Sequence, residues 1–171
     1  MSYDAKCDGW DFCVDSDILH KGQMTFTVRS APSREQFVKL RVPAWAKNAT
    51  LSVNGKSVAA RQGSFVELKR VWQAGDTATL TFSPAIEVLP YTGVEQAENG
   101  KSRFCLTYGP YLMALTGIGE TKLPTVTAAV DALCAEQTEA SVAIKINDGM
   151  AFVPYFEVAG DTAFDCYPIF E

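Results

Sequence analysis

The first side chains along the chain that could do chemistry are four carboxylates, Asp8, Asp11, Asp15 and Asp17. Two carboxyl groups flanking a sugar linkage carry out most glycoside hydrolysis, one as general acid and the other as base or nucleophile. We expect these four in a loop with no flanking strand to aim them, and we interpret them as a solvated or edge-protecting charge cluster. Calcium is a second ligand to consider, but the spacing lacks the alternating ligands and the glycine of an EF-hand loop.

Nucleophilic and metal chemistry have few candidates in this sequence. A Ser-His-Asp arrangement would have to use His20, which is the only histidine. The five cysteines are Cys7, Cys13, Cys105, Cys134 and Cys166. Because they form no Cys-x-x-Cys pair and His20 lies near no ligand cluster, we predict no catalytic residue, no metal site and no cofactor. We interpret the cysteines as buried free thiols; a Cys7–Cys13 disulfide would require an exported parent protein.

Aromatic side chains are the better candidates for a binding role. Sugar-binding β-sandwiches stack pyranose faces on exposed rings, and we assign this role to Trp10 and Tyr91. We expect an interdomain contact at Tyr108, Pro110 and Tyr111, because the Gly-Pro bend between the tyrosines would push their rings out of the regular pleat. The alternative for all of these rings is a place in the core or at its margin, where the polar atom finds a partner.

Composition excludes two classes of partner. The chain has 171 residues, a formal net charge of −5 and a pI near 4.9, and its basic residues are scattered. Phosphate binding needs clustered Lys and Arg, so we expect no nucleic-acid partner. No apolar run approaches the roughly 20 residues that span a bilayer, so we expect no membrane partner. Residues 1–8 also lack the basic and apolar regions of a signal peptide.

Short strands at even spacing dominate the middle of the chain. Residues 37–82 contain four apolar alternations separated by turn residues, which is typical of an antiparallel sandwich or barrel. Asn54-Gly55 between two of them predicts a hairpin with a type I′ turn. Residues 23–30 form an earlier strand. We therefore expect an irregular N-terminal segment over residues 1–22, packed on a β-sandwich domain over residues 23–171.

The C-terminal half is predicted from weaker signals. Apolar residues recur at helical spacing over residues 124–136, which makes this the one helix candidate. Closing strands are expected at residues 141–147, 150–158 and 164–170, with Asp148-Gly149 as a hairpin turn between the first two. The predicted fold class is all-β, an antiparallel and jelly-roll-like β-sandwich with at most one short helix.

Several motifs in one order give these strands a family likeness. FVKLRVPAWA at residues 37–46 resembles the L-R-I-P-x-W signature of the bacterial beta-L-arabinofuranosidase family of glycoside hydrolases. The same order continues with VNG at 53–55, FVELKRVW at 65–72 with GD at 75–76, and YGPYLMAL at 108–115. VPYFEV at 153–158 and FDCY at 164–167 resemble the closing segment of the family, except that Ala163 stands where an arginine is expected.

The resemblance implies a fold and a context for the chain. Members of the family carry the active site in an α/α barrel, where a zinc-bound cysteine is the nucleophile, and β-sandwich domains follow the barrel. This chain has no matching set of ligands, so it resembles the non-catalytic C-terminal region, giving stability and an interdomain surface to the catalytic α/α barrel of a parent chain. The alternative is an independent carbohydrate-binding module for plant-derived carbohydrate. The compartment of the parent, cytoplasmic, periplasmic or exported, stays open.

Overall fold

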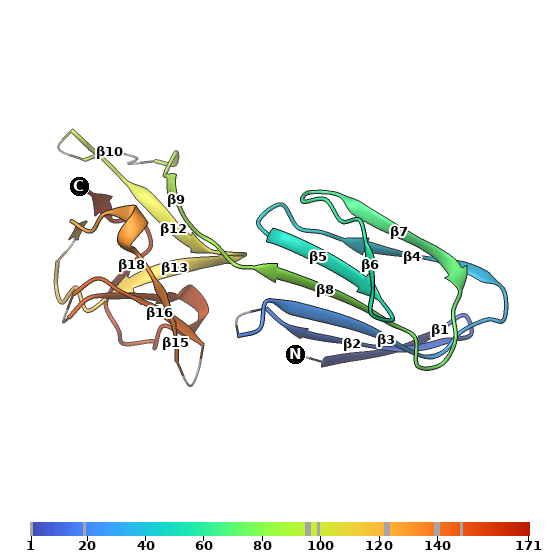
Figure 1. The fold of residues 1–171 in the computed structure, drawn as a ribbon. Coiled ribbons are helices and arrows are strands. Elements are labelled where there is room, and N and C mark those ends of the chain that lie inside the picture. The colour runs from blue at the N-terminus through green and yellow to red at the C-terminus, as the bar shows by residue number, and fades with distance from the viewer. Residues whose placement is uncertain are drawn as a thin grey trace. The chain divides into compact units, whose positions relative to one another are not determined.

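The computed structural model describes residues 2–18, 20–94, 97–98, 100–121, 124–138, 141–147 and 149–171. The chain is all-β, with antiparallel sheets packed as sandwiches, as predicted (Figure 1). It divides into two compact units, residues 1–84 and residues 85–171, rather than one domain over residues 23–171. The break follows Ser83-Pro84, where the missing proline N–H ends the strand ladder.

The first unit is a two-layer sandwich. Its larger layer is a six-stranded antiparallel sheet with the order β1-β2-β3-β8-β5-β6. Its smaller layer pairs only β4 with β7. The bounds are β1 Ser2–Cys7, β2 Trp10–Asp17, β3 Gln23–Ser30, β4 Glu35–Arg41, β5 Lys47–Val53, β6 Lys56–Val58, β7 Phe65–Val71 and β8 Thr77–Ser83.

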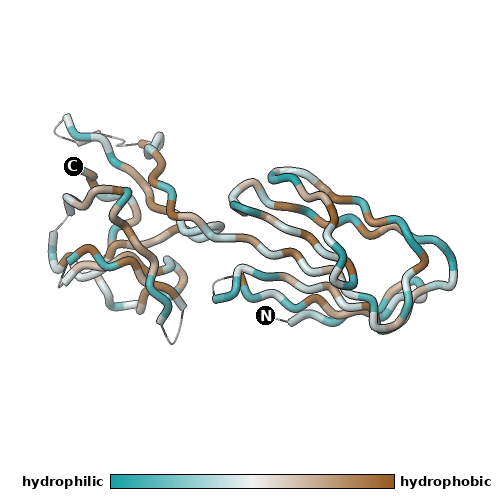
Figure 2. The backbone as a smooth tube through the Cα atoms, viewed as in Figure 1, coloured by the Kyte–Doolittle hydropathy of each residue, from teal (hydrophilic) through white to brown (hydrophobic). Residues whose placement is uncertain are grey.

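The alternation of apolar and polar residues along the strands builds the core between these two layers. Inward residues of the large sheet, among them Phe26, Leu51 and Leu80, meet Leu40 and Leu68 of the small one, and all five are buried. Figure 2 shows the hydrophobic residues recurring along the strands of this unit. Because successive side chains of a strand point to opposite faces, the alternation seen in the sequence is enough to define this core.

The N-terminal segment differs from the irregular loop expected over residues 1–22. Its described residues form a hairpin in which β1 pairs with β2 and β2 continues onto β3. Asp8 and Gly9 make the turn, with φ of 47° and 83°. Asp-Gly favours a type I′ hairpin turn as strongly as Asn-Gly does, so the signal was present in the sequence. The Asn54-Gly55 turn predicted between β5 and β6 is confirmed, with φ of 49° and 76°.

The second unit is built on one sheet with the order β15-β16-β17-β13-β12-β9, and β18 pairs with the end of β13. Phe152 of this sheet is fully buried and stacks on Phe170 at 6.1 Å. The described strands of this unit are β9 Ile86–Pro90, β10 Ala97–Glu98, β11 Lys101–Ser102, β12 Phe104–Tyr108, β13 Tyr111–Thr116, β14 Thr125–Val126, β15 Ala135–Gln137, β16 Val142–Lys145, β17 Ala151–Pro154, β18 Phe164–Asp165 and β19 Ile169–Phe170.

The helix expected over residues 124–136 is wrong. The described residues there form β14, a 3-10 turn η1 at Val130–Ala132, and β15. Val126 is fully buried where β14 pairs in parallel with β19, whereas Val130 is 43% exposed, so the apolar residues do not share one face. The β-branched run at residues 125–127 favours the extended chain.

The last expected strands are shorter than predicted. The strand expected over residues 150–158 stops at Pro154, and a 3-10 turn η2 follows at Tyr155–Glu157. The strand expected over residues 164–170 is split into β18 and β19. Asp148 of the expected Asp148-Gly149 turn lies outside the described residues, and the side chain of Asn147 accepts hydrogen bonds from the Gly149 and Met150 N–H groups.

Candidate functional site

Three of the four predicted carboxylates, Asp11, Asp15 and Asp17, lie on β2, Asp8 lies in the β1–β2 turn, and Asp11 is held by cations. Asp11 of β2 meets Lys6 of β1 at 2.9 Å and Arg29 of β3 at 3.6 Å. Arg29 also meets Asp4 at 2.6 Å. These ion pairs join three neighbouring strands at the outer side of the sheet. The arrangement is that of a surface charge cluster in which Asp4 and Asp11 face basic groups.

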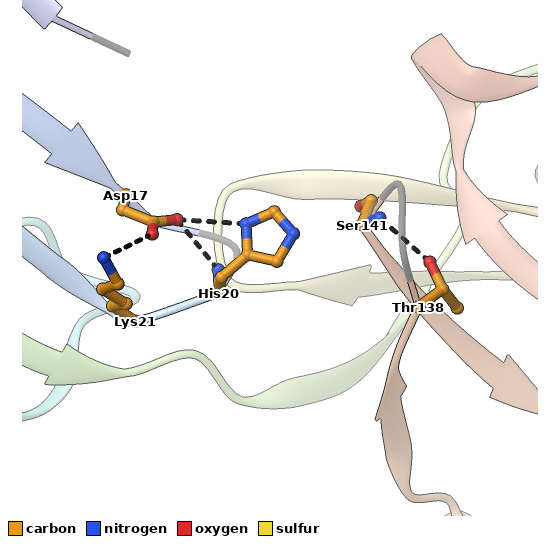
Figure 3. Close-up of polar contacts among 5 residues, drawn as sticks. All are labelled: Asp17, His20, Lys21, Thr138 and Ser141. Atoms are coloured by element: carbon orange, nitrogen blue, oxygen red, sulfur yellow. Dashed lines mark hydrogen bonds and ion pairs between the residues drawn. The ribbon is translucent and has the colours of Figure 1, made fainter.

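Asp17 and His20 form a clamp in the turn that follows β2 (Figure 3). One carboxylate oxygen of Asp17 accepts hydrogen bonds from the His20 backbone N–H at 3.2 Å and from the His20 ring Nδ1 at 3.1 Å. Lys21 Nζ lies 3.6 Å from the other oxygen. Burial acts to raise the pKa of Asp17, but the hydrogen bonds from His20 outweigh it and the pKa lies below its ordinary value. The side chain that a catalytic triad would need is therefore engaged in a local turn.

A second polar contact in Figure 3 closes the turn between β15 and β16. The Ser141 N–H donates to the Thr138 hydroxyl at 2.9 Å, and the Thr138 N–H donates to the Ser141 carbonyl at 3.0 Å. Ser141 is fully buried. The two bonds join the end of β15 to the start of β16.

The five cysteines are free thiols. Cys7 lies opposite Trp10 and Cys13 lies opposite Asp4, so the two N-terminal cysteines are not strand partners. Contrary to the expectation of buried thiols, Cys7 and Cys134 are exposed. Cys166 is buried, and burial, followed by the neighbouring Asp165 and Cys105, raises its pKa to about 11. A thiol with so high a pKa is a poor nucleophile at neutral pH.

Trp10 lies beside an apolar groove of the first unit. Its ring is half-buried, 6.4 Å from the Phe26 ring and 6.3 Å from the Trp72 ring. The groove has a volume of about 340 Å³. We call it the β4 groove; it is lined by Cys7, Trp10, Phe12, Phe26 and residues 37–40. The ring predicted as a sugar platform is thus one wall of a groove between the hairpin β1–β2 and strand β4.

Tyr91 is stacked inside an aromatic cluster of the second unit. Its ring lies 4.3 Å from the Tyr167 ring. The Arg103 guanidinium lies 5.8 Å from the Tyr91 ring and 6.0 Å from the Tyr167 ring, within cation–π range. Arg103 Nε also donates to the Tyr167 carbonyl at 2.8 Å, and its Nη2 lies 3.4 Å from Asp165. Tyr91 therefore supports Tyr167 from one side.

The Tyr108–Tyr111 turn does not push its rings out of the pleat, so that expectation is wrong. Tyr108 and Tyr111 are directly paired, and Gly109, with φ of 56°, makes a two-residue hairpin turn with Pro110. Tyr108 is 8% exposed and belongs to the core of its unit. Tyr111 is half-buried and its ring lies 5.3 Å from that of Phe156. Burial raises the pKa of both hydroxyls.

Three exposed rings near this hairpin were missed by the sequence analysis. Tyr155, Phe156 and Phe164 are 52%, 59% and 42% exposed. With Tyr111 they form two ring pairs, Tyr111–Phe156 at 5.3 Å and Tyr155–Phe164 at 5.6 Å. Because Tyr155 and Phe156 are neighbours in the chain, we call the four rings together the aromatic patch. The sequence signal for this exposure was the order Pro154-Tyr155-Phe156. A proline ends the strand, so the rings that follow it do not pack on a face of the sheet.

An adjoining cleft has a volume of about 460 Å³ and is lined by Leu112, Tyr155, Phe164, Asp165, Cys166 and Tyr167. It thus combines two rings of the aromatic patch with the tyrosine that Tyr91 supports. Among the residues that the structure describes, no group of three or more His, Cys, Asp or Glu side chains is placed to hold a metal ion. Within the same residues, no helix has the length and apolar character needed to cross a membrane.

Comparison with solved structures gives the same fold in much longer chains. A glycoside hydrolase matches with a TM-score of 0.71 and 17% identity, over 99% of this chain and 34% of its own. A GH127 beta-L-arabinofuranosidase from Geobacillus stearothermophilus T6 matches with a TM-score of 0.71 and 18% identity, over 99% and 32%. A GH127 beta-arabinofuranosidase matches with a TM-score of 0.61 and 15% identity, over 99% and 33%. This chain therefore spans about a third of the length of these proteins.

Comparison by sequence matches a shorter part of the chain than comparison by structure does. No curated protein matches the chain. A family model does match, and its description is beta-L-arabinofuranosidase, GH127 middle domain. The model covers residues 2–83, which is nearly the whole of the first unit. The part of this chain that spans β1 to β8 is thus similar in sequence to the middle domain of the GH127 glycoside hydrolases.

Proposed function

We propose that this chain is a non-catalytic β-sandwich region of a GH127-type glycoside hydrolase, and that it gives stability and an interdomain surface to a catalytic α/α barrel in the same parent chain. The observation that carries the proposal is the match of residues 2–83 to the GH127 middle domain. The matched glycoside hydrolases are about three times as long as this chain, so about two thirds of their length lies outside the match and is long enough to contain a barrel domain. We place the region C-terminal to that barrel, in keeping with the motif order of the family it resembles.

The chemistry of the described side chains supports an ancillary role. Asp4 and Asp11 form ion pairs with Arg29 and Lys6, His20 is bound to Asp17 within a turn, and Cys166 has a raised pKa. Paired catalytic carboxylates would instead face a common cleft and carry pKa values that are pushed apart. Among the motif residues that carry the family resemblance, Val42, Leu68 and Trp72 pack the core of the first unit, and Asn54-Gly55 closes a hairpin turn.

We assign the interdomain surface to the aromatic patch. It holds three large rings that are 42–59% exposed, which is uncommon for the surface of a monomeric domain. Pro110 is exposed at the tip of the neighbouring hairpin, and Tyr111 connects that hairpin to Phe156. Aromatic anchors of this kind carry most of the energy of protein interfaces. Of the three residues predicted from the sequence, Pro110 and Tyr111 therefore stay in the proposed interdomain surface. Tyr108 does not, because it is buried.

The interdomain role predicts a selective effect of Phe156→Ser in the parent. We expect the thermal inactivation of the glycosidase to be faster, because each lost anchor removes roughly 1–2 kcal/mol of interface energy. Tyr3→Ser is the matched control, since Tyr3 is 63% exposed on β1. Inactivation half-lives of the two variants, compared at one temperature, provide the measurement. Equal half-lives for Phe156→Ser and Tyr3→Ser would contradict the assignment.

An independent carbohydrate-binding module is the second candidate. The observation that favours it is the cleft of about 460 Å³ between Tyr155, Phe164 and Tyr167, with Tyr91 behind Tyr167. Calorimetric titration of the chain with arabinan-derived and related plant-wall oligosaccharides separates the two candidates. Heat of binding that Phe164→Ala abolishes would establish the module, and a flat titration across the panel leaves the ancillary role.

A further inference from the structure

Strand β4 has one unpaired edge. It is seven residues long and pairs with β7 on one side, and among the described residues no strand pairs with it on the other. Seven extended residues present about 23 Å of backbone at roughly 3.3 Å per residue. An uncovered edge of this length offers N–H and C=O groups that another strand can bind.

Charged side chains usually protect such an edge, and two of those on β4 form ion pairs with β7. Glu35 of β4 meets Lys69 of β7 at 2.9 Å, and Lys39 meets Glu67 at 3.6 Å. Both pairs run across the β4–β7 ladder, in which Phe37 lies opposite Lys69 and Lys39 lies opposite Glu67. Glu35 is therefore held toward β7, whereas Lys39, whose side chain is 63% exposed, pairs with Glu67 and also lines the β4 groove.

The same edge borders the β4 groove. A two-stranded layer is about 5 Å wide and a six-stranded layer about 24 Å, counting roughly 4.8 Å between neighbouring strands. The small layer therefore leaves part of the inner face of the large sheet uncovered. That part is apolar: Trp10 and Phe12 of β2 are half-buried there and pack against the core from its margin.

The β7 side of the small layer is different in character. The two hollows there mix charged and apolar residues: Val53, Val58 and Leu68 share one with Glu67, Lys69 and Arg70, and Phe65 and Val66 share the other with Arg61 and Glu67. The β4 groove differs in its four aromatic residues, Trp10, Phe12, Phe26 and Phe37, so a free backbone edge beside an aromatic groove is a property of the β4 side. A molecule that binds there would offer backbone hydrogen-bonding groups to β4 and apolar side chains to the β4 groove.

We propose that an extended segment of the parent chain, outside residues 1–171, adds to the free edge of β4 as a third strand and places alternate apolar side chains in the β4 groove against Trp10 and Phe12. Main-chain hydrogen bonds to β4 and pockets for every second side chain are the recognition mode of strand addition. The solved structures that share this fold have about two thirds of their length outside the matched region, which supplies such a segment. This inference rests on the proposed function, because it requires a longer parent chain.

Amide hydrogen exchange read by mass spectrometry tests the proposal. The parent and the 171-residue chain are compared under the same conditions, after cooperative thermal unfolding has established that the shorter chain is folded. We expect peptides from Glu35–Arg41 to exchange at least about tenfold more slowly in the parent, because its edge amides gain a strand partner. Peptides from Phe65–Val71 are the internal control and should differ little. Equal exchange of β4 in the two proteins would overturn the proposal.

Should the shorter chain fail to fold alone, the parent supplies its own comparison. There β4 is compared with β1, the edge strand of the large sheet. Slow exchange over Glu35–Arg41 with fast exchange over Ser2–Cys7 supports the added strand, and fast exchange over both overturns it. Protection of β4 that appears only when oligosaccharide is added would assign the groove to a sugar and equally overturn it.

Alkylation of Cys7 gives a second readout that requires no mutation. Cys7 lines the β4 groove and is exposed in the chain described here, as is Cys134 outside the groove. We expect iodoacetamide to modify Cys7 more slowly than Cys134 in the parent, and both readily in the 171-residue chain. Glycosidase activity of the parent is measured separately: its absence would count against the proposed function, whereas ready Cys7 alkylation in an active parent would count against the added strand alone.

Discussion

At the residue scale, two of the motifs that mark the family resemblance, VNG at 53–55 and GD at 75–76, are joined by hydrogen bonds. Asn54 Nδ2 donates to Asp76 Oδ1 at 2.7 Å, and Asn54 Oδ1 accepts from the Thr77 N–H at 2.8 Å. Asp76 Oδ2 accepts from the Gln73 N–H at 2.9 Å and lies 3.3 Å from Arg70. Asp76 is 8% exposed. The Asn54-Gly55 and Gly75-Asp76 turns are therefore tied together by one nearly buried carboxylate.

Asp76→Asn should destabilise the first unit. Burial acts to raise the pKa of Asp76, but the hydrogen bonds from Asn54 and Gln73 and the charge of Arg70 outweigh it, so the pKa lies below its ordinary value. Replacing one acceptor oxygen by an amide N–H leaves a donor facing a donor and costs about 1–3 kcal/mol of unfolding free energy. Urea unfolding followed by tryptophan fluorescence measures it, because Trp10, Trp45 and Trp72 all lie in the first unit.

The same variant gives a pH prediction. Because the folded pKa of Asp76 is depressed, its contribution to stability is present above the unfolded value of about 3.9 and is lost as the pH falls through the folded pKa. The wild-type chain should therefore lose more unfolding free energy below about pH 4 than Asp76→Asn does. Asp15→Asn, at an exposed position of β2, is the matched control. Identical pH profiles for wild type and Asp76→Asn would refute the clamp.

Thiol reactivity is a further residue-scale prediction. The raised pKa of Cys166, about 11, leaves roughly one thiolate in a thousand at pH 8. Alkylation of the native chain followed by peptide mass spectrometry should modify Cys7 and Cys134 and spare Cys166. Modification of Cys166 at the rate of the exposed thiols would contradict its burial. Unfolding the chain in urea should make all five cysteines equally reactive.

At the element scale, the turns determine the sheets and explain which strands could be predicted. Asn54-Gly55 was recognised as a hairpin signal and the hairpin is present. Asp8-Gly9 carries the same backbone preference, but the acidic composition around it masked the alternation of Trp10, Phe12 and Val14, and β1 and β2 were missed. At residues 124–136 the pairing of Val126 with β19 in the core overrides a helical spacing, and the only local signal for it was the β-branched run at residues 125–127.

Two glycines with positive φ should differ in their tolerance of alanine. Gly22 has φ of 56°, and a Cβ there would lie 2.1 Å from the Phe82 carbonyl oxygen of β8. Gly55 has φ of 76° with nothing within 4 Å of such a Cβ. Gly55→Ala should cost only the left-handed conformation, about 1–2 kcal/mol, whereas Gly22→Ala must also displace β8. Urea midpoints that are lowered equally in the two variants would contradict this account of the β3–β8 contact.

At the scale of the whole molecule, the sequence predicts the fold class but not the division of the chain into two compact units. Alternation and turn residues are local, so they identify an all-β sandwich from the sequence alone. The boundary at residues 84 and 85 depends on which strands pair, and strand pairing joins residues far apart in the chain. The aromatic patch was missed for a related reason: exposure of Tyr155 and Phe156 follows from where β17 ends, which periodicity does not reveal.

We propose that this region supports a glycosidase without performing its chemistry. This role is tested by comparing the parent with a form lacking the region, in initial rates on an arabinofuranoside substrate and in the half-life of that activity on heating. We expect the shortened form to keep measurable turnover at low temperature and to be inactivated faster. Unchanged activity together with an unchanged half-life would contradict it.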